Sequence, residues 1–244
     1  MKRQVLVLTS FLILLLLVLP PAALGADNPL SFLENTQGFS QAIKILILLT
    51  LLTFLPALVL TMTSFTRLVV VFSLLRQALG TQQAPPNQVI VGLALFLTFF
   101  IMSPVFTKVH KEALVPYLEG QIHEGEALDK ILPAFRTFML RQTRAKDLEV
   151  FQQISRTPLP KTIDEIPTTI LIPAFITSEL KTSFEIAFLL YIPFLVIDMV
   201  VASVLMSLGM MLLPPIMISL PFKLMLFVLV DGWNLIVESM VRSF

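Results

Sequence analysis

The sequence predicts an all-α protein with the hydropathy of a multi-span membrane protein, and three observations carry this prediction. The chain is 56% hydrophobic and only 14% charged, with a mean hydropathy of +0.89, whereas soluble domains carry about 25% charged residues. The apolar residues gather in blocks long enough to cross a bilayer as helices. The charges gather instead between positions 107 and 185, which hold 10 basic and 11 acidic residues.

The first 25 residues, 1–25, have the pattern of a secretory signal peptide. Two cations at positions 2 and 3 precede the apolar stretch Val5–Leu19, and small residues allow cleavage before Ala26. The alternative is an uncleaved first span, but 15 apolar residues are short for a span of about 20. Cleavage would leave residues 26–42 as a loose polar segment at the start of the mature chain.

Residues 43–106 predict a first apolar helical hairpin. Its two span-length runs are Ile43–Met62 and Val89–Phe106. Pro56 is expected to kink the first run, because proline removes a backbone donor from the helix interior.

The segment between these two runs predicts a helix and a turn. Ser64–Leu79 has a helical pattern that Gly80 is suited to end, and Ala-Pro-Pro-Asn at 84–87 predicts a turn. Arg67 and Arg76 are the charged residues here, and no acid accompanies them. A short segment with only positive charge is expected on the cytoplasmic side. Topological anchoring is one reading of the two arginines, and packing inside the protein is the other.

Residues 107–185 form a polar insert that is expected to be helical. Ala145–Ile154 and Ile170–Ser183 predict two short helices on either side of a proline-punctuated linker, Thr157–Lys161. The clearest helix has apolar residues at i, i+3, i+4, i+7, i+10 and i+11, namely Leu128, Ile131, Leu132, Phe135, Phe138 and Met139.

Residues 186–244 predict a second apolar helical hairpin. Its arms are Ile186–Leu212 and Ile216–Val237, and the double proline at 214–215 separates them. Small residues lie along the first arm and allow neighbouring helices to approach closely, namely Ala202, Ser203, Ser207 and Gly209.

Two charged residues lie inside the arms of this second hairpin. Asp198 and Lys223 have their midpoint at about residue 210.5. A turn near Met210-Met211 would bring them level, so that they pair within one subunit or across a subunit boundary. A turn centred on the prolines would instead place Asp198 level with Asp231. In either case a charge on a close-packing helix indicates an interface and not a lipid-facing surface.

Methionines are concentrated around the predicted turn, where five of the eleven fall between positions 199 and 217. Methionine is unbranched and flexible, so it adapts to surfaces of variable shape. The cluster therefore predicts either a deformable constriction or irregular core filling near the end of a hairpin.

No catalytic, cofactor or metal motif is present in the sequence. Phosphate-loop, nucleophile-elbow and zinc-protease patterns are missing, and there is no cysteine. The two histidines, His110 and His123, lie 13 residues apart without a ligand-like pattern of acids. The net charge of +1 gives no case for nucleic-acid binding. The sequence thus predicts a protein that is not an enzyme, and the acids of the insert are read as a solvated face.

Two long stretches resemble a known family. MTSFTRLVVVFSLLRQALG begins the first stretch, Met62–Val105, and FLVIDMVVASVLMSLGMMLLPP lies within the second, Leu171–Trp233. Both are similar to the FliP family of bacterial flagellar type III protein export. The resemblance implies the core subunit of an export gate in the inner membrane, at the flagellar basal body, through which unfolded flagellar proteins pass. It also implies a homopentamer, with helical hairpins wound into a cone.

The resemblance further implies partners and a site. FliQ and FliR join the gate, FlhA and FlhB are further export components, and no cofactor is implied. A methionine-rich gasket closes the family's channel, and here it corresponds to Met210 and Met211, with Gly209 before them and Met206 one turn earlier. Family members often carry three consecutive methionines at this place, whereas Leu212 follows the second one here. Asp198 and Lys223 would then face neighbouring hairpins or subunits.

Two other functions compete with the export gate. A proton- or solute-coupled secondary transporter would use Asp198 as a titrating residue. Such folds tend to carry inverted repeats, and this sequence shows no internal repeat of 20–50 residues. A structural scaffold without a pore is the remaining alternative, in which the methionines only fill space.

Overall fold

The computed structural model describes most of the chain after position 60. The described residues are 43, 46, 49, 50, 53, 57, 60–81, 83–155, 165–210 and 212–244. The predicted signal peptide, the loose segment 26–42 and Pro56 lie outside them. The chain divides into two units, 1–55 and 56–244. Described positions of the first unit are helical, and the second unit contains the elements that follow.

The described residues form helices and no strand, which confirms the all-α prediction. Helix α4, Phe65–Ala78, lies within the predicted 64–79 segment and is buried along one face by Leu68, Val71, Phe72 and Leu75. This i, i+3, i+4, i+7 spacing is that of a helix packed on one side. Gly80 follows with φ +79°, the left-handed conformation that ends helices.

The predicted span Val89–Phe106 is bent. Helix α5 is Asn87–Ile101, and its axis turns by 59° into the helical run that begins at Ser103. Pro104 has no N–H to donate to the carbonyl of Phe100, so the hydrogen-bond ladder breaks at this point. The elements after the bend are α6, Ser103–Val109, a π-helical turn η2, His110–Leu114, and α7, Val115–Leu118.

Two of the three helices predicted in the insert are confirmed as separate helices. Helix α8 is Glu124–Gln142 and helix α9 is Ala145–Ser155. Met139 of the predicted apolar face is fully buried, and Phe138 packs edge-on against Phe175 with ring centroids 6.0 Å apart. The apolar face of α8 thus contributes to a small core together with the beginning of helix α10, Thr168–Ser207.

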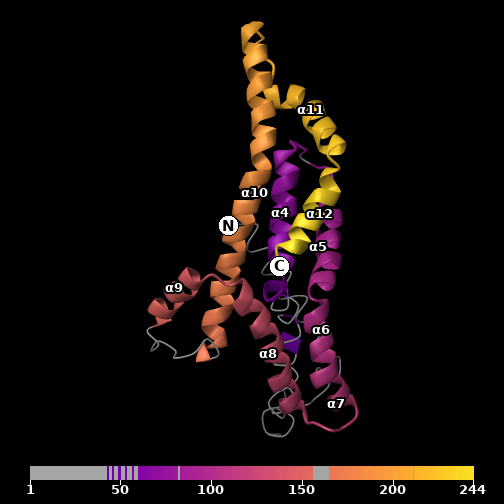
Figure 1. Ribbon diagram of the computed structural model, residues 1–244, viewed down its shortest axis with the longest axis vertical. Coiled ribbons are helices and arrows are strands. Elements are labelled where there is room, and N and C mark those ends of the chain that lie inside the picture. Colours follow the sequence, from indigo (N-terminus) through magenta and orange to yellow (C-terminus); the bar gives the residue numbers. More distant parts are fainter. Residues whose placement is uncertain are drawn as a thin grey trace, which may run out of the picture. The chain divides into compact units, whose positions relative to one another are not determined.

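Helix α10, Thr168–Ser207, is 40 residues long. It joins the helix predicted at Ile170–Ser183 to the span predicted at Ile186–Leu212, so those two segments are one helix. The boundary expected at residue 185 falls inside it, because the hydropathy changes there while the internal prolines of the helix, Pro173 and Pro193, lie elsewhere. Figure 1 shows α10 beside α4, and the main core is built on the buried face of α4, with Ile90 of α5 and Phe194 of α10 among its other buried members.

The second predicted hairpin also contains a bend. Helix α11, Pro215–Leu229, returns along α10, and α12, Gly232–Arg242, follows after a turn of 64°. The block predicted as Ile216–Val237 is therefore two helices. Asp231 adopts a left-handed φ of +52° at the bend.

One helix among the described residues, α10, is long and apolar enough to cross a membrane by itself. The bent pairs α5 with α6–α7 and α11 with α12 qualify only if each pair is counted as one span.

Candidate functional site

The connection between α10 and α11 is built by local backbone chemistry. Gly209 has φ +73°, its N–H donates to the carbonyl of Met206, and the N–H of Met210 donates to that of Leu205. This pair of bonds is the Schellman motif, which satisfies carbonyls at a helix end and favours glycine at the left-handed position. Pro215 then begins α11 at its first position, where a missing N–H has no cost.

This turn brings Asp198 and Lys223 together within one chain. Lys223 Nζ donates to Asp198 Oδ2 over 2.6 Å and to the carbonyl of Ala78 over 3.1 Å. Ser219 Oγ donates to the other carboxylate oxygen over 2.5 Å. We call these four residues the hairpin junction. The structure therefore places Asp198 level with Lys223, whereas Asp231 accepts a hydrogen bond from Asn234 over 2.6 Å.

The two charges of the hairpin junction differ in exposure. The side chain of Lys223 is 4% exposed and that of Asp198 is 34% exposed. Ala78 is the last residue of α4, so its carbonyl has no partner within the helix and lies at the negative end of the helix dipole. The buried ammonium is thus stabilised by a carboxylate and by a helix end, and it ties α4, α10 and α11 together.

Beyond the hairpin junction the two arms form an apolar hairpin tip, defined here as the described residues between 199 and 217. Figure 1 shows the end of α10 reaching past α4. Met206 and Met210 are 59% and 49% exposed, and Leu212 is fully exposed. Met211, the other predicted gasket residue, lies outside the described residues. Large exposed apolar patches mark interaction surfaces in folded proteins.

A second buried ion pair was missed by the sequence analysis. Arg67 donates from Nε and Nη2 to the two carboxylate oxygens of Glu179, over 2.9 and 2.5 Å. Its remaining donors bond the side chain of Gln142 at 3.0 Å and the carbonyl and hydroxyl of Ser243 at 2.8 and 3.1 Å. The guanidinium also lies 3.8 Å from the centre of the Phe244 ring. We call Arg67, Gln142, Glu179 and Ser243 the basal junction.

The contacts of Arg67 and Arg76 bear on the choice between topological anchoring and packing inside the protein. Arg67 and Glu179 are both buried, so Arg67 is a packing residue whose charge is neutralised inside the protein. Arg76 is half-buried and donates to the carbonyl of Pro85 over 3.3 Å, which joins α4 to the following turn. A signal for Glu179 was present in the sequence: it is an acid on the apolar face of a helix, four residues from Phe175 and from Ser183.

A further ion pair near α10 is partly exposed. Arg144 pairs with Glu185 over 2.5 Å at the surface, and this hydrogen bond raises the pKa of the Arg144 guanidinium. Exposed pairs of this kind contribute little to stability. Among the described residues no group of three or more His, Cys, Asp or Glu side chains lies close enough together to hold a metal ion.

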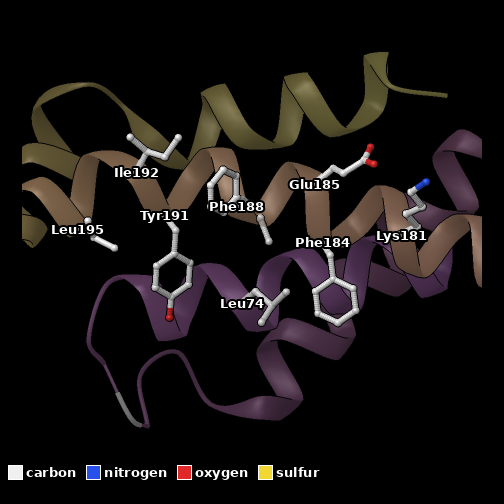
Figure 2. A pocket seen from close by; sticks show the side chains of 9 residues that line it. Leu74, Lys181, Phe184, Glu185, Phe188, Tyr191, Ile192 and Leu195 are labelled. Carbon is white, nitrogen blue, oxygen red and sulfur yellow. The ribbon is translucent and has the colours of Figure 1, made fainter.

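A long apolar groove of about 1010 Å³ runs along α10 and α4. Figure 2 shows Phe184, Phe188 and Leu195 along α10, with Lys181 and Glu185 toward one end of the groove. A smaller groove of about 480 Å³ lies between the arms of the hairpin and is lined by aliphatic side chains and Phe222. Surfaces of this composition suit packing against other apolar surfaces.

Comparison with known proteins gives consistent similarities. The family described as "FliP family" matches residues 48–240. The chain is 53% identical over 211 residues to the flagellar biosynthetic protein FliP of Bacillus subtilis (strain 168), covering 86% of this chain and 96% of that relative. It is 52% identical over 218 residues to the FliP protein of Aquifex aeolicus (strain VF5), covering 88% of this chain and 91% of that relative.

One of the relatives is longer than this chain. The FliP protein of Buchnera aphidicola subsp. Acyrthosiphon pisum is 56% identical over 211 residues, which cover 86% of this chain and 56% of that relative.

Proposed function

The chain belongs to the FliP family, and we propose on that basis that it is the core pore-forming subunit of a flagellar type III protein export gate. In this role it passes unfolded flagellar proteins across the bacterial inner membrane, at the base of the flagellum. In this proposal the energy for export comes from other components, since the sequence carries no phosphate-loop motif.

One observation supports the pore-forming role above the others. The hairpin tip exposes flexible apolar side chains, including Met206, Met210 and the fully exposed Leu212, at the end of arms that the hairpin junction holds to α4. No part of the chain that the structure describes covers this surface. Several copies arranged in a ring would bury the tips against one another and would place their methionines around one axis.

The proposed gate contains five copies of this chain. FliQ and FliR complete it, and FlhA and FlhB act with it as export components, with unfolded flagellar proteins as substrates. The apolar grooves along α10 and between the hairpin arms support contacts with such helical partners, because they are long and have few charged residues.

The proposed gasket consists of Met206, Gly209, Met210 and Met211. Gly209 sets the direction of the tip through its positive φ, and the methionines supply soft side chains that seal when the channel is empty and yield when a polypeptide passes. Leu212 occupies the third position of the seal. Leucine keeps that position apolar, although it is less flexible than methionine.

The proposed function can be tested with purified proteins in liposomes. The chain together with FliQ and FliR should form a channel that conducts ions only when the gasket methionines are replaced, and the chain alone should not carry protons. A secondary transporter would give the opposite pattern, with proton flux from the chain alone that depends on Asp198. Proton flux of that kind would contradict the export-gate proposal.

A further inference from the structure

The methionines of the chain fall into two groups that differ in exposure. Those of the hairpin tip that the structure describes have between 49% and 70% of their surface exposed, namely Met199, Met206, Met210 and Met217. Three others are fully or almost fully buried inside the protein, namely Met102, Met139 and Met240. The methionine side chains of the tip are therefore open to small reagents, whereas those of the core are not.

A peroxide is the reagent that attacks an exposed methionine side chain. The lone pair of the thioether sulfur attacks one oxygen of hydrogen peroxide, and the O–O bond breaks as the S–O bond forms. The transferred oxygen becomes the sulfoxide, while its proton moves to the other oxygen, which leaves as water. Sulfur is thereby oxidised by two electrons and the peroxide is reduced by two. Methionine sulfoxide reductases reverse the change, and no cysteine competes for the oxidant because the chain has none.

The surroundings of the tip methionines are apolar. Positions 199–222 carry no charged residue. Within the described part of the tip, the side-chain hydroxyls are those of Ser203 and Ser207, and they already donate to the carbonyls of Met199 and Val204 over 2.9 and 2.8 Å. A sulfoxide oxygen buried between packed tips would lack a side-chain donor from this segment, and burial of a polar group without a partner is unfavourable. Oxidation of the tip therefore opposes its packing against another apolar surface.

We propose that the hairpin tip is a site of reversible methionine oxidation by peroxide, and that sulfoxides at Met206 and Met210 loosen the seal. This inference rests on the proposed function, because it takes these residues as part of the gasket. Methionines that face the axis of a ring are reached from the channel, and hydrogen peroxide is small enough to enter where a polypeptide passes. The reaction converts a flexible apolar side chain into a polar one. Leucine has no sulfur, so Leu212 keeps its position apolar.

The chemical modification is tested first, on the purified complex of the full chain with FliQ and FliR. The complex is treated with hydrogen peroxide and digested, and peptide mass spectrometry measures the gain of one oxygen at each methionine. Met206 and Met210 should be oxidised while the three buried methionines stay reduced, and methionine sulfoxide reductases should remove the added oxygen. A tip that stays reduced, or buried methionines that react as fast as the tip, would overturn the proposal.

The effect on the seal is tested by the ion conductance of the same complex in liposomes. Peroxide should raise the conductance of the unmodified complex, and the reductases should return it to its starting value. The M206L/M210L complex should stay closed before and after peroxide, because leucine is apolar and has no sulfur. The M206Q/M210Q complex should conduct without peroxide, because glutamine resembles the sulfoxide in length and polarity.

M225L is the matched control for these variants. It removes an exposed methionine of α11 that lies outside the hairpin tip, so peroxide should still open the complex that carries it. Thermal unfolding checks that each variant complex is folded. The proposal would be overturned if peroxide opened the M206L/M210L complex as far as the unmodified one, or if the M206Q/M210Q complex stayed closed.

Failure of this inference can be told apart from failure of the proposed function. M206A/M210A shortens both side chains without adding a polar group, so it tests the seal alone. If that variant conducts while the oxidised complex stays closed, oxidation does not control the seal and the export-gate proposal is unaffected. If both stay closed, the tip methionines do not form the seal, and the proposed gasket fails together with this inference.

Discussion

Lys223 donates to Asp198 across the α10–α11 hairpin over 2.6 Å, with the ammonium almost fully buried and the carboxylate one-third exposed at 34%. The asymmetry matters because the two charges have different surroundings when the partner is lost. Asp198 would keep water and its bond from Ser219, whereas Lys223 would keep only the carbonyl of Ala78. The hairpin junction is therefore more sensitive to loss of the acid than to loss of the base.

The first prediction follows from this asymmetry. Asp198→Ala should destabilise the fold by about 2–4 kcal/mol, because it strands a buried ammonium, and complex assembly should fail. Lys223→Met should cost less, since an apolar side chain of similar length replaces the buried charge. Urea unfolding in detergent and native gels of the complex measure the two effects.

The double variant D198A/K223M provides the control for the first prediction. It should be more stable than Asp198→Ala alone, because no buried charge remains without a partner. If Asp198→Ala assembles normally, or if the double variant is less stable than the single one, the hairpin junction does not have this role.

The second prediction concerns the bend between α11 and α12. A Cβ at Gly232 would lie 2.4 Å from the Phe227 ring, which is itself buried and packs edge-on against Trp233 at 5.5 Å. Gly232→Ala should therefore destabilise the protein by about 1–3 kcal/mol, as overpacking does. The emission of Trp233 should shift, and it is a clean probe because the chain has one tryptophan.

Gly92→Ala is the matched control for Gly232→Ala. Gly92 lies in α5 with nothing within 4 Å of a built Cβ. Gly92→Ala should be neutral or stabilising by up to about 1 kcal/mol, because alanine is the better helix former. Phe227→Leu should partly rescue Gly232→Ala, and the absence of any rescue would mean that the ring is not the obstacle.

The third prediction is that Arg67 cannot be replaced by lysine. Lysine keeps the positive charge but loses the two-point grip on Glu179 and the bonds to Gln142 and Ser243. Arg67→Lys should cost roughly 2–4 kcal/mol, since buried hydrogen bonds to charged groups are lost. Thermal unfolding measures the change. Arg76→Lys is the control: this arginine is half-buried and makes one long hydrogen bond, so its replacement should destabilise the protein far less. Equal effects at the two positions would indicate that the basal junction adds no stability.

The sequence predicted elements whose signals are local. Helices α4, α8 and α9 were found because apolar periodicity and end residues such as Gly80 are written in adjacent positions. Pro104 was visible as a source of the bend after α5, yet its effect on the predicted span was not recognised. At the bend, Gly232 lies so close to the Phe227 ring of the preceding helix that a Cβ would clash, and helical periodicity does not reveal this contact.

Hydropathy predicted a boundary at residue 185 that does not exist, because α10 continues through it. The polarity of the sequence changes near residue 185, whereas the helix runs through this position, which lies between its two internal prolines, Pro173 and Pro193. The two ion pairs also differ in how far apart their residues lie in the sequence. Asp198 and Lys223 could be matched by counting from a nearby turn, whereas Arg67 and Glu179 are 112 positions apart. Only tertiary packing brings that second pair together.

The last prediction concerns the hairpin tip. Met206→Ala with Met210→Ala should leave the fold unchanged, because both side chains are largely exposed in the single chain, but cells with an intact export complex should leak small solutes. The leak is measured as membrane conductance in cells that express the variant at the level at which the unmodified chain restores motility. Ile154→Ala, an exposed apolar position on α9, is the control, and cells that carry it should not leak.

Gly209→Ala tests the backbone conformation that directs the tip. An alanine at φ +73° is strained, so the variant should be destabilised by about 1–2 kcal/mol and assembly of the tips should be impaired. If the methionine variant stays tight, the exposed tip packs against a partner without forming the seal.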